Sequence, residues 1–112
     1  MPNWNAIETS FSNQPMPQQF GELAASLARL KSWSQKNASS EIVPLLLKES
    51  LLYINLLQKQ NHPHHVELTQ LQKLLQEWIN QGNTVVINIA ATWSERVLNM
   101  SGLLVATDSK TA

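Results

Sequence analysis

The sequence predicts an all-α protein, a four-helix bundle of up-down topology with an additional short helix at its N-terminus. Leucine and tryptophan recur at every third or fourth position from Pro17 onward, which is the period of an amphipathic helix. Proline, glycine and short polar stretches divide the chain into segments of helical length. A chain of 112 residues has room for one domain. We place this helical-bundle domain at residues 1–105 and expect a flexible polar tail at 106–112.

The first expected element is a short helix over residues 3–12. Trp4, Ile7 and Phe11 recur there at helical spacing, and Asn3 is a residue type that favours helix N-caps. Amphipathic helices anchor in the grooves of other proteins through such a triplet, so these three are candidate residues for binding a partner or ligand. The same pattern fits a helix that lies across the end of its own bundle, and we favour that alternative.

The next two expected helices cover residues 17–36 and 41–60. An apolar stripe from Phe20 to Leu30 marks the first, and the polar segment "NASS" separates it from the second. In the second helix, apolar side chains occupy more than half of the circumference. Such a helix is typically central, with several neighbours, or else forms an oligomer interface.

The last two expected helices cover residues 63–81 and 84–101. The leucines of the first fall on one face, and Gly82 follows as a residue that favours helix ends. The segment "TVVINI", which opens the second, has the composition of a strand. The apolar residues from Val86 to Met100 nevertheless follow helical spacing, so we predict a helix.

Composition and charge disfavour nucleic-acid and membrane partners, although regulatory nucleic-acid binding through the basic residues near position 30 stays an alternative. The formal net charge is zero and charged residues make up 14% of the chain, against about 25% in a typical domain. Basic residues cluster only at Arg29, Lys31 and Lys36, which is too few for the counterion release that drives nucleic-acid binding. For the same reason we expect no binding to an anionic membrane surface.

The expected compartment is the cytoplasm. The chain contains no cysteine, which excludes disulfides and Cys-ligated zinc. Its first residues, "MPNWNAIETS", lack the basic and apolar regions of a signal peptide, and its apolar runs are too short to span a bilayer.

One carboxylate and one guanidinium fall on apolar stripes of the expected helices. In helical projection Glu49 lies among the leucines of helix 41–60, and Arg96 lies among the apolar residues of helix 84–101. A lone buried charge is costly, whereas a carboxylate paired with the planar fork of an arginine is far less so. Either the two residues pair, inside the bundle or across a dimer interface, or each lies at the edge of its stripe and reaches water. Both are candidate binding residues.

All three histidines lie in "NHPHHVEL", at residues 61–68. Zinc requires three or four ligands in a tetrahedral array, and at this spacing at most two of these side chains can converge. We therefore predict a structural turn that opens helix 63–81, with a weak surface metal site at the turn of His62 and His65 as the alternative. The sequence contains no P-loop, no G-x-S-x-G and no Glu-x-x-His pair, so we expect no catalytic residue, no cofactor and no enzyme.

Three segments, "LAASLARLKSW" (23–33), "LLLKESLLYI" (45–54) and "WSERVLNMSGLL" (93–104), resemble an uncharacterised family of small cyanobacterial helical proteins. The resemblance covers most of the chain, implies a bacterial, photosynthetic setting and implies nothing about mechanism. From the residues themselves we predict a non-enzymatic interaction or scaffold protein that self-associates or docks a protein partner. The alternative is a bundle that binds a small ligand or metal through Glu49 and Arg96 or through the His62–His65 turn.

Overall fold

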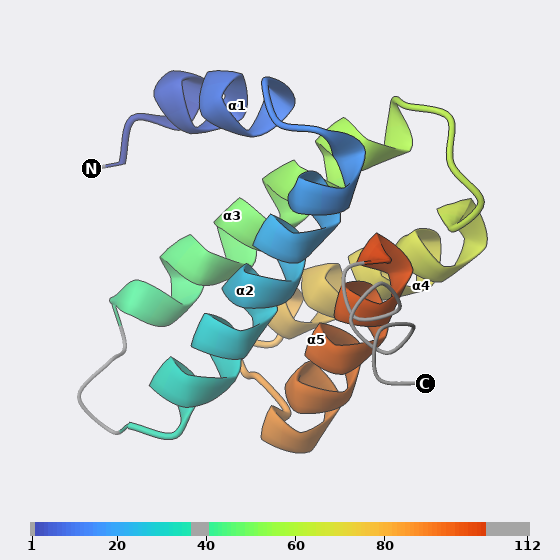
Figure 1. Cartoon of the computed structure of the whole chain (residues 1–112). Coiled ribbons are helices and arrows are strands. Elements are labelled where there is room, and N and C mark those ends of the chain that lie inside the picture. The colour runs from blue at the N-terminus through green and yellow to red at the C-terminus, as the bar shows by residue number, and fades with distance from the viewer. Residues whose placement is uncertain (1, 37–40, 103–112) are drawn as a thin grey trace.

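All regular structure in the described part of the chain is helical (Figure 1). The computed structural model describes residues 2–36 and 41–102. Its helices are α1 (Trp4–Ser12), α2 (Met16–Ser34), α3 (Ile42–Gln58), α4 (His65–Asn80) and α5 (Ile87–Ser101). The all-α prediction is therefore confirmed, and α1 is the additional N-terminal helix. The expected tail at 106–112, the last residues of the expected domain at 103–105 and the "NASS" linker at 37–40 lie outside the described residues.

The start of α5 is the largest error among the expected boundaries; the others agree to within two residues. Helix α5 begins at Ile87, three residues later than the spacing predicts. The chain reverses at Gly82 and Asn83, whose φ angles are 78° and 62°. It is still extended at Val86, with φ −89° and ψ 107°, a conformation that suits a β-branched residue. The strand-like composition of "TVVINI" therefore partly describes the extended backbone that precedes the helix.

Short-range signals set several helix ends. The Asn3 side chain accepts a hydrogen bond from the backbone N–H of Ala6 at 3.1 Å, as expected of an N-cap. Pro17 lies in the first turn of α2, where its missing N–H costs nothing. Gly102 follows α5 with a φ of 80°, a left-handed conformation that glycine adopts without strain.

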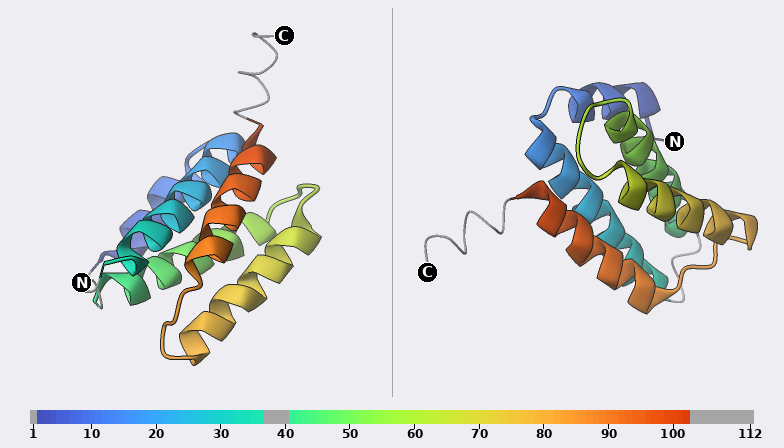
Figure 2. Two further views of the ribbon diagram at one scale, coloured as in Figure 1. Left: turned by 90° about the horizontal axis from the view of Figure 1, so that it is seen from below. Right: turned by 90° about the vertical axis from the view of Figure 1, so that its right-hand side faces the viewer.

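Helix α2 lies between α5 and α3, and α4 packs against α3 (Figure 2). Small residues allow α2 and α5 to approach closely: Ala24 and Ala90 are buried, and the Ser94 hydroxyl donates to the Ala24 carbonyl at 3.0 Å. Helix α3 contacts α1, α2 and α4, which accounts for its wide apolar arc. The arc therefore belongs to a central helix, the first of the two alternatives that the sequence left open.

The core contains one fully buried polar contact between α2 and α3. The hydroxyls of Ser26 and Ser50 lie 2.8 Å apart and hydrogen-bond to each other. One hydroxyl donates and the other accepts, which offsets part of the desolvation cost of burying two polar groups. None of the helices in the described residues has the length and apolarity that crossing a bilayer requires.

Candidate functional site

Helix α1 turns its apolar face toward this protein's own helices α3 and α2 (Figure 1). The Phe11 ring is buried and stacks on the Tyr53 ring of α3, with centroids 4.2 Å apart and an interplanar angle of 8°. At the other end of α1, the Lys48 ammonium lies 5.7 Å from the centroid of the Trp4 ring. Ile7 is partly buried between them. The triplet Trp4, Ile7 and Phe11 therefore has the arrangement of a strap across the protein's own helices α2 and α3.

A buried glutamine fixes the turn between α1 and α2. The Gln19 amide nitrogen donates to the carbonyls of Phe11 and Gln14 at 3.1 and 3.0 Å. Its amide oxygen in turn accepts from the Gln60 side chain at 2.7 Å. Because Gln60 follows the end of α3, this network ties three segments of the chain together. The position of α1 therefore depends on specific hydrogen bonds as well as on apolar burial.

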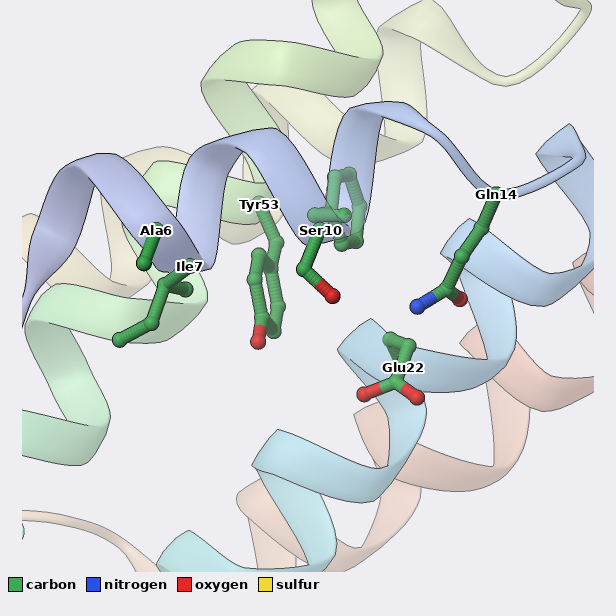
Figure 3. A pocket seen from close by; sticks show the side chains of 7 residues that line it. Ala6, Ile7, Ser10, Gln14, Glu22 and Tyr53 are labelled. Carbon is green, nitrogen blue, oxygen red and sulfur yellow. The ribbon is translucent and has the colours of Figure 1, made fainter.

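An open pocket with a volume of about 290 Å³ lies beside this strap, between α1, α2 and α3 (Figure 3). The Tyr53 hydroxyl and the Glu22 carboxylate both point into it, and the Gln14 amide and the Ser10 hydroxyl lie at its rim. Burial raises the pKa of Tyr53 to about 12, and the charges of Glu49 and Glu22 act in the same direction. The hydroxyl is therefore a neutral phenol at physiological pH, in a negative local potential.

Glu22 and Tyr53 are not among the site residues predicted from the sequence. They lie 31 positions apart, on helices whose contact only the tertiary structure reveals. One feature of the sequence pointed to Tyr53. A tyrosine on an apolar helix carries a hydroxyl that requires water or a hydrogen-bond partner.

Glu49 and Arg96 do not pair with each other within the chain, so the first of the two alternatives for these residues is not formed there. Instead the Glu49 carboxylate accepts a hydrogen bond from the Arg29 guanidinium at 2.9 Å. Helix α2 lies between α3 and α5, so the Glu49 side chain on α3 meets Arg29 of α2. The Glu49 side chain is 19% exposed and that of Arg29 46%, so the pair lies at the edge of the interface and is partly screened by solvent.

Arg96 has other partners on the surface. Its guanidinium lies 4.0 Å from the centroid of the Trp93 ring, one turn earlier on α5. A nitrogen of the same group is 3.7 Å from a carboxylate oxygen of Glu67 on α4. Arg96 thus lies at the edge of its apolar stripe and reaches water, which is the second of the two alternatives for this residue.

The histidines form the predicted turn between α3 and α4. Nδ1 of the buried His62 accepts a hydrogen bond from the backbone N–H of His64 at 3.0 Å. The His62 ring stacks on the His65 ring at 3.9 Å and meets the Phe20 ring edge-on at 5.4 Å. Burial lowers the pKa of His62, and the neighbouring histidines lower it further, while the nearby Leu57 carbonyl opposes the shift.

This arrangement uses His62 for packing and for capping the turn. The His64 ring nitrogen is 3.6 Å from the Glu67 carboxylate, which also lies near Arg96. Across residues 2–36 and 41–102, no group of three or more His, Cys, Asp or Glu side chains is placed to hold a metal ion.

Comparisons with protein-family models, with curated proteins and with solved structures found no match to this chain.

Proposed function

We propose that this chain is a small non-enzymatic interaction protein, a helical bundle that docks a second copy of itself or another protein. The proposal rests on an apolar ridge at the start of α5. The exposed fractions are 44% for Val86, the extended residue before α5, and 39% for Ile89, in the first turn of α5. The residues between them, Ile87 and Asn88, carry no charge. We call Val86 and Ile89 the α5 ridge.

Surface chemistry supports self-association through this ridge. The formal net charge is zero, and much of the polarity comes from asparagine and glutamine rather than from charged groups. Two copies therefore approach each other without long-range repulsion, and a near-zero net charge promotes association. Contact between two such ridges would remove large apolar side chains from water at little electrostatic cost. A second copy of the chain is thus the occupant that we favour.

The test is the mass in solution of matched surface variants. Sedimentation velocity and light scattering at two protein concentrations should show self-association of the wild type and its loss in Ile89→Lys. The matched control is Val66→Lys, because Val66 on α4 is 73% exposed and lies outside the ridge. Ile89→Lys and Val66→Lys should have equal helical content by circular dichroism, since neither residue belongs to the core.

Two results would contradict the proposed self-association. One is a wild type that stays monomeric at the higher concentration, which would leave only a different protein as the occupant. The other is an equal loss of association in both lysine variants, which would show that added charge rather than the ridge decides the outcome.

We also infer that the four long helices form an up-down bundle. Six residues separate α3 from α4 and six separate α4 from α5, and short connections of this kind favour antiparallel neighbours.

The cytoplasmic location, the cyanobacterial resemblance and the absence of nucleic-acid or membrane partners stay predictions from the sequence. Binding of a ligand jointly by Glu49 and Arg96 is disfavoured, because each already has a different charged partner on a different helix.

A further inference from the structure

We propose that the pocket beside α1 is a binding site for a small organic ammonium ion, a protonated primary amine on an apolar or aromatic body. The site is lined by seven residues from three helices and the turn that joins α1 to α2: Ala6, Ile7, Ser10, Phe11, Gln14, Glu22 and Tyr53. Its occupant is inferred from the chemistry of that lining, and the inference is independent of the α5 ridge.

The charge of the lining selects a cation. Glu22 is the one charged residue among the seven, and its carboxylate points into the pocket (Figure 3). Glu49 adds to the negative potential at the Tyr53 hydroxyl, and Arg29, which opposes it, is held by its hydrogen bond to Glu49. An anion would therefore meet an unfavourable field in this pocket, whereas a cation would gain a charge-assisted hydrogen bond to Glu22.

The polar groups at the pocket favour a ligand that donates hydrogen bonds. The Glu22 carboxylate only accepts, and the Tyr53 and Ser10 hydroxyls and the Gln14 amide oxygen can each accept as well. A primary ammonium group carries three N–H donors that point in different directions, so it can satisfy several of these acceptors at once. A quaternary ammonium lacks these donors and should bind more weakly.

The apolar part of the lining fits the body of such a ligand. Ile7 and the stacked rings of Phe11 and Tyr53 form an apolar wall beside the polar groups. An aromatic or alkyl group can pack there, and the ring system adds attraction for the cation. The volume of about 290 Å³ lies just below the range of about 300–1,000 Å³ for ligand pockets, so the site suits a small ligand.

The hydrogen bonds of Gln19 hold this pocket in shape. They fix the carbonyls of Phe11 and Gln14 at the end of α1, so two of the lining residues are positioned before any ligand arrives. A preformed site loses less conformational entropy on binding than one that must be assembled. The pocket therefore needs only side-chain adjustment to accept an amine.

The experiment is a titration with phenethylamine, followed by ¹H–¹⁵N correlation spectra of the whole chain. Phenylacetate and 2-phenylethanol are the matched anionic and neutral probes, since they keep the aromatic body and change only the polar group. We expect saturable shifts at residues that line the pocket with phenethylamine, weaker binding of the alcohol and no binding of the acid. Equal binding of all three probes, or no saturable shift with the amine, would overturn the proposal.

Two variants test the role of the carboxylate. Glu22→Gln keeps the shape of the side chain and removes its charge, so it should weaken amine binding roughly tenfold or more. Glu8→Gln is the matched control, because Glu8 is exposed on α1 outside the pocket and the same unit of charge is lost. Equal weakening in both variants would show that net charge alone attracts the amine, and would refute a built site.

Discussion

Replacement of Phe11 by alanine tests whether α1 is held to the bundle by the aromatic stack on Tyr53. Truncation of a buried phenylalanine in a rigid core costs about 3–5 kcal/mol. Helix α1 has only nine residues, and its main contacts within the described part of the chain are with α2 and α3. Undocking of α1 can therefore relieve the cavity, and the loss is limited to the free energy that docking contributes.

We accordingly expect Phe11→Ala to lower the free energy of unfolding by about 1.5–3 kcal/mol, the value of burying one such side chain. An undocked helix of this length is unstable in water, because isolated helices shorter than about 12–15 residues are marginal. Hydrogen exchange in α1 should thus rise to the rate of an unfolded peptide, while α2 to α5 keep their protection.

Hydrogen exchange read by mass spectrometry, together with urea denaturation, measures both effects. Asn5→Ala is the control, because Asn5 is exposed on the outer face of α1 and its loss leaves the stack intact. Wild-type protection of the α1 amides in Phe11→Ala would refute the reasoning, because α1 would then be held by something other than this ring.

Three further predictions concern the core, the turn and the ion pair. Ser26→Ala strands the buried Ser50 hydroxyl and should cost about 1–3 kcal/mol in urea denaturation, while replacement of both serines by alanine should recover part of that loss. The pKa of His62 is lowered in the folded state, so the unfolded state binds the proton more tightly. The free energy of unfolding should therefore fall as the pH drops below about 6.5. The wild type should lose more of it over this range than His62→Asn does. Arg29→Met should cost less than about 1 kcal/mol, because solvent screens its half-exposed pair with Glu49; a loss of several kcal/mol would show that the carboxylate is effectively buried.

Helical period was sufficient to predict the fold class and most helix boundaries. The spacing of leucines and tryptophans depends on local geometry alone, and it gives each helix and most of its buried face, although Val86 and Ile89 of the expected stripe are exposed. The start of α5 was predicted three residues too early. Gly82 and Asn83 both adopt positive φ, and such a turn marks the end of α4 but not the residue at which α5 begins. The turn at the histidines was predicted for a local reason, since Pro63 cannot lie in the interior of a helix.

Contacts between helices could not be predicted in the same way. Helical projection places Glu49 and Arg96 on apolar stripes, but it does not say which neighbour each stripe meets. Arg29 pairs with Glu49 because α2 lies next to α3, which is a fact of tertiary packing. The pocket beside α1 has the same origin, since Glu22 and Tyr53 converge only after α1 docks across α2 and α3.

Paramagnetic relaxation of methyl signals by an inert soluble agent, measured at low and high protein concentration, tests the proposed docking surface most directly. In dilute solution the methyls of Ile89 and Val66 should both be strongly relaxed, whereas those of the buried Leu71 should not. At high concentration Ile89 should become protected while Val66 stays accessible. Protection of Ile89 in dilute solution, or equal accessibility of Ile89 and Val66 at every concentration, would contradict the proposed docking surface.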